Sequence, residues 1–323
     1  MYDDSMTLAS CAFSPTSPTL TAWHWRHTPR RATRWPHAGL AAAAALVAAL
    51  LALSGCSAPQ AGIIRAPNGS AASAEATVDR LGAVLRAEHS APAMALLLGE
   101  QHDVPEHHRI EQQVIATLAA RGVLAAVALE MADAGATTAA LQPHSNEAQT
   151  KLALNWQDNS WPWADYGPAV MAAVRAGVPV IGANLPNSAM KASMADSKLD
   201  TQLPGPALKA QQQLIRLGHC NLLPEGQITP MTRVQIARDR QMAQVLADAA
   251  VPGKIVVLVA GSAHVNRQLG VPQHLPEALH ARSVLLQAGD GADQDNAFDA
   301  TWGTPSRPEV DYCAGLRDQF KGQ

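Results

Sequence analysis

The stretch Ala95-Leu96-Leu97-Leu98-Gly99-Glu100-Gln101-His102-Asp103 joins an apolar run directly to a titratable cluster. A short apolar run that ends in a glycine is typical of a buried strand in an α/β sheet. Ligands of such sheets bind outside the carboxyl ends of the strands. We therefore expect a strand that ends here and a functional site that begins at Glu100 and His102.

Four more apolar runs follow, and segments with helical periodicity separate most of them. The predicted strands cover residues 93–99, 123–130, 178–182, 255–260 and 283–287, and the predicted helices cover residues 105–121, 167–176 and 229–250. Strands that are apolar almost throughout are typical of a sheet covered on both faces. We therefore expect an α/β fold with a mostly parallel sheet between helices, and a helical insertion or lid within residues 184–225.

The first predicted helix has clear end signals and an inward-facing histidine. Asp103 suits its N-cap region, Pro105 suits its first turn, and Gly122 suits its C-terminal stop. Its apolar stripe is formed by Ile110, Val114 and Leu118. His107 lies at the centre of that stripe and His108 at its edge, so His107 is expected either to contact a ligand near the cleft or to be a core histidine.

Polar side chains stand at the ends of four predicted strands. Glu100 and His102 follow the first strand, Glu130 ends the second, Asn184 follows the third, and His264 follows the fourth. Parallel strands end at the same edge of a sheet, so these residues are expected to share a cleft. Each one alone could be a helix N-cap or a structural hydrogen-bonding group, but their joint occurrence favours a site.

The last predicted helix carries an arginine on its apolar face. Arg238 falls within the apolar stripe, whereas Asp239 is expected to point away from it. An inward-pointing guanidinium needs an anion. That anion could be Glu100 or Glu130 in a structural ion pair, or an acidic group of a ligand.

Aromatic side chains are scarce but clustered. Trp156, Trp161 and Trp163 stand close together in the sequence, and Tyr166 follows them. The cluster could form a binding surface for a flat apolar ligand, or it could pack against the helix that follows it.

The N-terminal region has the pattern of a secretory signal. Its basic residues are Arg26, Arg30, Arg31 and Arg34. The uncharged run 38–53 that follows is short for a membrane span and ends in Leu53-Ser54-Gly55-Cys56, which resembles a bacterial lipobox. This resemblance implies cleavage before Cys56 and lipidation of its thiol and its new amino group.

Three regions follow from this pattern. Residues 1–55 are expected to be a signal peptide, with Met6 as an alternative to Met1 as the start, residues 56–76 a flexible tether, and residues 77–323 a single domain. Removal of residues 1–55 takes away two acidic and four basic residues, which changes the net charge from −3 to −5. The sequence shows no basic surface of the kind that binds nucleic acid.

Two cysteines remain in the predicted domain. Cys220 and Cys313 form an even pair in a protein expected to be exported, so we expect a disulfide bond between them. The alternative is a pair of buried free thiols.

Several motifs together resemble the ChaN family of haem-binding lipoproteins, over residues 93 to 272. They are Leu97-Leu98-Gly99-Glu100-Gln101-His102-Asp103, His107-His108-Arg109, Ala128-Leu129-Glu130-Met131, Trp163 to Pro186, Gly218-His219-Cys220, Leu223-Pro224-Glu225, Gln235 to Met242 and Val257 to Val265. One departure is Gln235-Ile236-Ala237-Arg238-Asp239, where the family usually reads Gln-Arg-Ala-Arg-Asp. It leaves Arg238 as the basic residue of this stretch.

The resemblance implies haem binding in iron uptake. Haem needs an apolar slot, an axial ligand and cations for its propionates. Tyr166, beside Trp163, is the expected axial ligand, with His102, His107 or His264 as alternatives, and Arg238 and Lys191 are the expected propionate contacts. The other expected partners are the outer membrane of the cell envelope, reached through the lipid anchor, a second copy of the chain and an outer-membrane haem transporter.

The competing hypothesis is a hydrolase, because ChaN-like proteins are distantly similar to erythromycin esterases and to the Tiki and TraB proteins. Glu100, His102, Glu130 and His264 would then hold a divalent metal or activate water directly. The stretch Gly261-Ser262-Ala263-His264 lacks the Gly-x-Ser-x-Gly pattern of a serine nucleophile turn.

Overall fold

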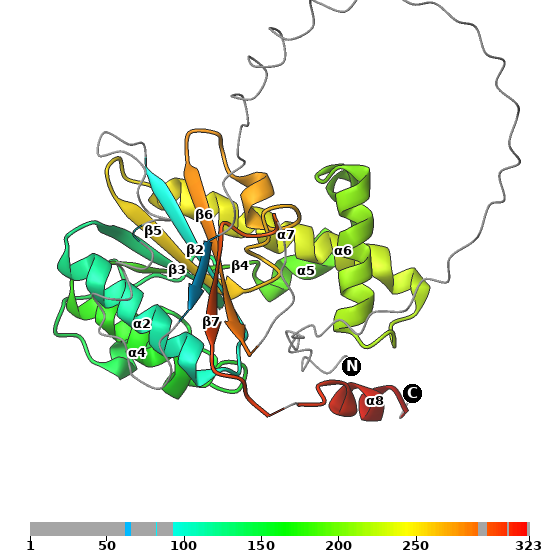
Figure 1. Ribbon diagram of the computed structural model, residues 1–323, viewed down its shortest axis with the longest axis horizontal. Coiled ribbons are helices and arrows are strands. Elements are labelled where there is room, and N and C mark those ends of the chain that lie inside the picture. Colours follow the sequence, from blue (N-terminus) through cyan, green and yellow to red (C-terminus); the bar gives the residue numbers. More distant parts are fainter. Residues whose placement is uncertain (1–61, 66–81, 83–92, 290–295, 309, 322–323) are drawn as a thin grey trace, which may run out of the picture. The chain divides into compact units, whose positions relative to one another are not determined.

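The computed structural model describes residues 62–65, 82, 93–289, 296–308 and 310–321 (Figure 1). The predicted signal peptide, the lipobox with Cys56 and most of the predicted tether lie outside the described residues. Within the described ranges, no helix combines the length and the apolar character that a membrane crossing requires.

Seven parallel strands form one sheet in the described part of the chain. They are β1 (Gly62–Arg65), β2 (Met94–Glu100), β3 (Leu124–Asp133), β4 (Val180–Asn184), β5 (Ile255–Gly261), β6 (His280–Ala288) and β7 (Ala300–Thr304). Their order across the sheet is β1-β7-β6-β2-β5-β3-β4. The predicted α/β fold with a parallel sheet is confirmed. Strand β2 is central and ends level with β5, because Glu100 is the register partner of Gly261.

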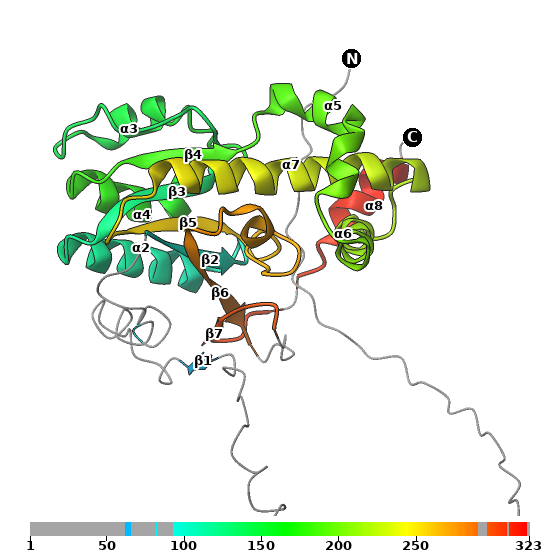
Figure 2. The same cartoon turned by 90° about the horizontal axis from the view of Figure 1, so that it is seen from above.

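Helices cover both faces of the sheet, as predicted. The helical elements are α2 (Pro105–Ala120), α3 (Glu147–Ala153), α4 (Trp163–Arg175), α5 (Asn187–Ala195), η1 (Ser197–Thr201), α6 (Gly205–Gly218), α7 (Glu225–Ala249), η2 (Val271–His274) and α8 (Cys313–Lys321). Helices α2 and α4 lie on one face and α7 on the other (Figure 2).

Alternate residues of β2 feed two separate cores. Leu96 and Leu98 pack with residues of α2 and α4, whereas Ala95 and Leu97 pack with residues of α7. All four side chains are fully buried. This alternation requires a strand without polar positions, which explains why the run reads as continuously apolar.

Helix α2 matches the predicted helix 105–121 closely, except at its N-terminus. Gly122 follows the helix with a φ of +70°, a conformation that glycine adopts without steric cost. The N-cap is Val104, without a side-chain cap bond. The expected capping by Asp103 is therefore wrong, and Asp103 pairs instead with Arg307 and Tyr312 near the C-terminus.

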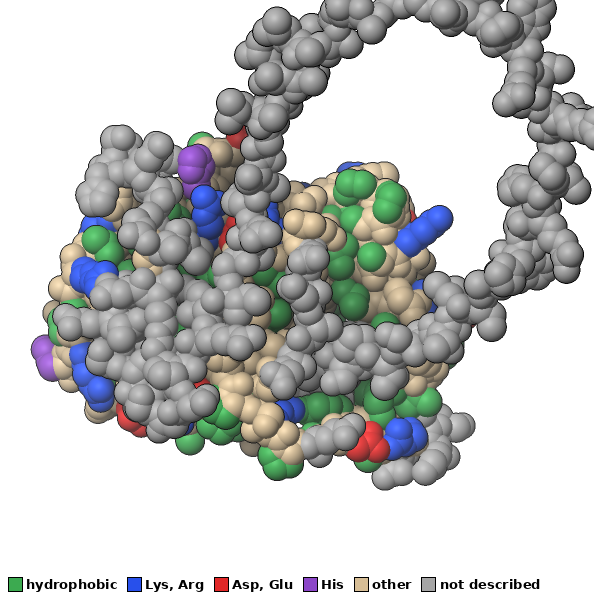
Figure 3. Space-filling view, in the orientation of Figure 1, with side chains coloured by type: hydrophobic (Ala, Val, Ile, Leu, Met, Phe, Trp, Pro, Cys, Tyr) green, Lys and Arg blue, Asp and Glu red, His purple; other side chains and the backbone are tan. Residues whose placement is uncertain are grey.

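Two other predicted helices begin one turn earlier than expected. Helix α4 starts at Trp163 and α7 at Glu225, so Pro168 and Pro230 lie inside these helices. The predicted helical insertion is present as α5, η1 and α6. Only Gln211 and Ile215 are buried in α6, and Figure 3 shows hydrophobic side chains at the surface over this helix.

A disulfide bond joins Cys220, in the connection between α6 and α7, to Cys313 at the start of α8. The two Cα atoms are 5.8 Å apart, which is an ordinary separation for a disulfide. The pairing is the one expected from the sequence, and it fastens the C-terminal helix to the helical insertion.

Candidate functional site

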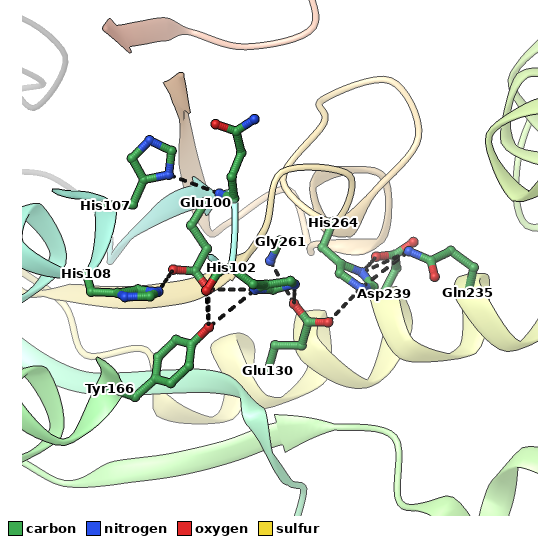
Figure 4. Close-up of polar contacts among 11 residues, drawn as sticks. Glu100, His102, His107, His108, Glu130, Tyr166, Gln235, Asp239, Gly261 and His264 are labelled. Atoms are coloured by element: carbon green, nitrogen blue, oxygen red, sulfur yellow. Dashed lines mark hydrogen bonds and ion pairs between the residues drawn. The ribbon is translucent and has the colours of Figure 1, made fainter. Parts of the chain in front are cut away.

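The carboxylate of Glu100 is the centre of a buried polar cluster at the end of β2 (Figure 4). Its Oε1 atom accepts a hydrogen bond from the hydroxyl of Tyr166 at 2.8 Å and lies 2.6 Å from Nδ1 of His102. Its Oε2 atom lies 3.3 Å from Nε2 of His108. One carboxylate thus holds three side chains from the β2–α2 loop, from α2 and from α4.

Glu100 and His102 form an ion pair. Burial works to raise the pKa of Glu100, but the bonds to His102 and His108 outweigh it and hold that pKa well below its ordinary value. Burial likewise works to lower the pKa of His102, but the bond to Glu100 and the charge of Glu130 raise it overall. Both shifts favour the charged form of the group.

A second acid–imidazole group lies at the ends of β3 and β5. Oε1 of Glu130 lies 3.3 Å from Nε2 of His264, and its Oε2 accepts a hydrogen bond from the backbone nitrogen of Gly261 at 2.7 Å. On the other side of the ring, Nδ1 of His264 lies 2.6 Å from Oδ1 of Asp239 on α7. His264 is thus held between two carboxylates.

The charges of this second group follow from its contacts. Burial works to raise the pKa of Glu130, but the charge and bond of His264 lower it to about 2. Burial works to lower the pKa of His264, but Glu130 and Asp239 raise it to about 10. Burial raises the pKa of Asp239 to about 6, against the lowering effect of His264. His264 is therefore an imidazolium at neutral pH.

His102 lies between the two groups. Its Nδ1 faces Glu100, and its Nε2 lies 3.9 Å from Oε2 of Glu130. Its side chain is 13% exposed, whereas the carboxylates beside it are buried. The expected convergence of Glu100, His102, Glu130 and His264 is therefore present, and His102 is the member with the most solvent access.

The aromatic cluster divides into packing residues and one site residue. Trp156 and Trp163 contact each other edge to face at 5.0 Å, and the Trp163 ring packs on Gly167 of α4. Trp161 contacts the ring of His102 at 4.9 Å between centroids. The ligand contact by Trp163 stays a prediction, and Trp161 is the tryptophan that lies beside the cluster.

His107 is buried as expected, but it points away from the cluster (Figure 4). Its Nδ1 accepts a hydrogen bond from the backbone nitrogen of Gln101 at 3.0 Å, so its proton is on Nε2, which lies 3.2 Å from Oγ1 of Thr304. Burial lowers the pKa of His107 to about 4. His108, at the edge of the apolar stripe of α2, contacts Glu100 instead. This is possible because α2 is also buried beside that stripe.

Arg238 is buried, as its place in the stripe predicts, but it forms no ion pair with Glu100 or Glu130 within 4 Å. It is 8% exposed, and its Nε atom has no hydrogen-bond partner among the described residues. Burial lowers its pKa, while the charges of Glu130, Asp239 and Asp133 oppose that change. The structural ion pair expected as one alternative is therefore not formed.

Two further expected residues lie apart from the cluster. The side chain of Asn184 accepts a hydrogen bond from the backbone nitrogen of Leu185, which is a local turn contact. Lys191 is exposed on α5. In the described part of the chain, neither residue contacts the acid–imidazole groups.

Sequence reasoning missed Asp239 and Glu111. Asp239 was expected to point away, but α7 is also covered by η2 and the loop that carries His264, so this side of the helix is buried as well. Glu111 is fully buried, and burial together with the charge of Glu100 raises its pKa well above the ordinary value. Its spacing of three residues from His108 on the same helix was the available signal.

The cluster brings together the four residues that the hydrolase hypothesis names, Glu100, His102, Glu130 and His264. No three His, Cys, Asp or Glu side chains of the described residues are arranged to hold a metal ion. The pKa of His264 is raised to about 10, which disfavours the neutral imidazole that a histidine general base needs near pH 7. His264 acts here as a fixed positive charge between Glu130 and Asp239.

Residues 87–275 match the protein family described as "Haem-binding uptake, Tiki superfamily, ChaN". A structure described as cofacial heme binding to ChaN of Campylobacter jejuni is 26% identical, with a TM-score of 0.55, over 64% of this chain and 86% of that chain. The type III effector HopBA1 is 15% identical, with a TM-score of 0.40, over 76% of this chain and 99% of that chain. The curated proteins gave no match.

Proposed function

The chain belongs to the ChaN family, which is described as haem-binding, and we propose that it binds haem at the strand-end cluster. The observation that carries the proposal is the bond between Glu100 and His102. A histidine that binds a metal almost always donates its other ring N–H to a carboxylate, a carbonyl or water. Glu100 accepts a hydrogen bond from Nδ1–H of His102, so Nε2 is the nitrogen available to iron.

His102 fits the role of axial ligand better than the other expected candidates. His264 has acidic partners at both ring nitrogens. The two nitrogens of His107 contact the backbone nitrogen of Gln101 and the hydroxyl of Thr304. Nε2 of His102 has its nearest acidic oxygen at 3.9 Å. When bound, haem would supply an iron centre that takes such a ligand.

Tyr166, the ligand expected from the sequence, does not fit that role in this structure. Its side chain is 2% exposed, and its hydroxyl donates a hydrogen bond to Glu100. Burial and the charge of Glu100 raise the pKa of Tyr166, which opposes the phenolate form that binds iron. We assign Tyr166 to holding the Glu100 carboxylate in place.

Arg238 fits a contact with a haem propionate. Its guanidinium is largely desolvated, it forms no ion pair in the described structure, and its Nε has no hydrogen-bond partner there. A buried guanidinium nitrogen without a hydrogen-bond partner is costly, and an acidic ligand group would relieve that cost. Trp161, edge to face with His102, supplies an apolar aromatic surface for the macrocycle.

The role in uptake at the cell envelope is also proposed. It is supported by the family description and by the lipobox-like Leu53-Ser54-Gly55-Cys56, which would anchor residues 56–323 in the outer membrane after removal of residues 1–55. A second copy of the chain and an outer-membrane haem transporter are the proposed protein partners. Mass spectrometry of the protein from a membrane fraction tests the anchor, because an acylated N-terminal Cys56 is expected.

Titration with haemin tests the binding proposal. The purified protein is expected to give a saturable change in the Soret absorption band, and the His102→Ala variant is expected to lose it. His144→Ala is the matched control, since His144 is exposed in a loop outside the cluster. A wild-type protein that gives no saturable change would overturn the proposal.

A further inference from the structure

The chain after β7 returns to the loop that carries His102. Nη1 of Arg307 lies 2.6 Å from Oδ2 of Asp103 and donates a hydrogen bond to the backbone oxygen of the same residue at 3.2 Å. The hydroxyl of Tyr312 donates to Oδ2 of Asp103 at 2.5 Å. The guanidinium of Arg307 also lies over the Tyr312 ring, 5.5 Å from its centroid. Asp103 therefore has two partners near the C-terminus.

The residue after Tyr312 is Cys313, whose disulfide bond to Cys220 ties this segment to the connection between α6 and α7. Cys220 and Asn221 both have a φ of +57°, in the left-handed region that these residues rarely occupy. Such a conformation persists where the surroundings hold it in place. The bond to Cys313 is one such constraint.

From these contacts we propose a C-terminal clasp, consisting of Arg307, Tyr312 and the Cys220–Cys313 disulfide, that limits access to His102. The inference rests on the proposed haem site, because access matters only if a ligand enters there. His102 immediately precedes Asp103, the residue that the clasp holds. The loop that presents His102 is therefore attached both to the sheet and, through Asp103, to the C-terminal segment.

The disulfide is the element that makes the clasp switchable. Partly exposed ion pairs such as Arg307–Asp103 are weak individually, so they hold best when a tether keeps both partners close together. Both cysteines are partly exposed, so a reductant can reach them. A dithiol would give two electrons and two protons to the disulfide, which yields the thiols of Cys220 and Cys313 and the cyclic disulfide of the reductant.

Two measurements on the full chain test the clasp, one of them without haem. Hydrogen–deuterium exchange of the peptide that contains His102 and Asp103 is expected to be about tenfold faster after reduction with dithiothreitol, because the clasp no longer holds the loop. Association of haemin, followed in the Soret band by stopped flow, is expected to accelerate in parallel. The Cys220→Ser/Cys313→Ser variant should be fast with and without the reductant.

Arg307→Ala and Tyr312→Phe keep the test decisive if the double cysteine variant does not fold. Both leave the disulfide intact, and both should speed exchange at the Asp103 peptide. Lys209→Ala on the exposed side of α6 is the control and should change nothing. Equal exchange in the oxidised and reduced protein would overturn the clasp. Faster exchange without any haemin binding would support the clasp and overturn the proposed function instead.

Discussion

Glu130 and His264 hold each other in their charged forms, with Oε1 of Glu130 only 3.3 Å from Nε2 of His264. Glu130 lies near the end of β3 and His264 lies in the loop after β5, and Asp239 on α7 contacts the other side of the His264 ring. The pair therefore links the sheet to the helix that covers its second face. Its stability depends on a proton on His264.

Stability is expected to fall as pH rises above neutrality. The folded-state pKa of His264 is about 10, above the unfolded value of about 6.5, so its contribution is complete below pH 6.5 and is lost as pH rises through 10. The free energy of unfolding, measured in urea, should fall by about a few kcal/mol between pH 7 and pH 10. The variant His264→Gln should not show this fall. The prediction is contradicted if the free energy of unfolding falls equally steeply with pH in the two proteins.

Acid should weaken the fold through His107. Its folded-state pKa of about 4 lies below the unfolded value of about 6.5, so its contribution is present above pH 6.5 and is lost as pH falls through 4. The expected loss in the free energy of unfolding is on the order of 3 kcal/mol, because the unfolded chain binds this proton at a higher pH than the folded protein does. His107→Asn keeps an acceptor for the Gln101 nitrogen without titrating. Thermal unfolding of this variant should depend less on pH between 6.5 and 4, and an unchanged dependence would count against the assignment.

Glu100→Gln should weaken haem binding. The amide is a poorer acceptor for His102 than a carboxylate, and loss of such a partner costs about 10- to 100-fold in metal affinity. Haemin titration measures the effect. The control is Glu277→Gln, because Glu277 is exposed beyond η2. Equal affinities of the two variants would remove Glu100 from the site.

Tyr166→Phe distinguishes a structural tyrosine from an iron ligand. The variant loses the hydrogen bond to Glu100, so it should lose about 1–3 kcal/mol in urea unfolding. Its haem absorption spectrum should match that of the wild type, because His102 is still present. A changed Soret band in a folded variant would return the ligand role to Tyr166.

Gly99→Ala should destabilise the protein, because a Cβ atom there would lie 2.3 Å from Cγ2 of Val265 and 3.1 Å from the Cα of Ser262. Overpacking of this kind costs about 1–3 kcal/mol. Gly205→Ala at the start of α6 is the matched control, since nothing lies within 4 Å of its Cβ position. If both variants unfold at the same urea concentration, the end of β2 is less tightly packed than described.

Apolar runs and strand-end chemistry were sufficient to predict five of the strands and the convergence of Glu100, His102, Glu130 and His264. Strand β7 was missed because Ala300–Thr304 is short and not continuously apolar, and β1 is shorter still. Such short strands depend on the edge that they join, which local sequence does not encode.

The partners of the site residues were harder to predict than the residues themselves. A helical wheel assumes a single buried face, and α7 is buried on a second side near Asp239. The same assumption placed His107 at the cleft, although the neighbouring His108 contacts Glu100. The free nitrogen of His102 and the donor role of Tyr166 depend on distances within the folded site.

The strand order has a consequence for the timing of synthesis. Strand β2 lies between β5 and β6 in the sheet. Both neighbours come much later in the chain, after β3, α4 and α7. Until the ribosome has released β5 and the loop after it, the carboxylate of Glu130 has no His264 beside it, and β2 has neither neighbour. The nascent chain must therefore carry the apolar strand β2 unpaired while about half of the 323 residues are synthesised. A chaperone that binds short apolar segments has a target at residues 94–98 during this interval.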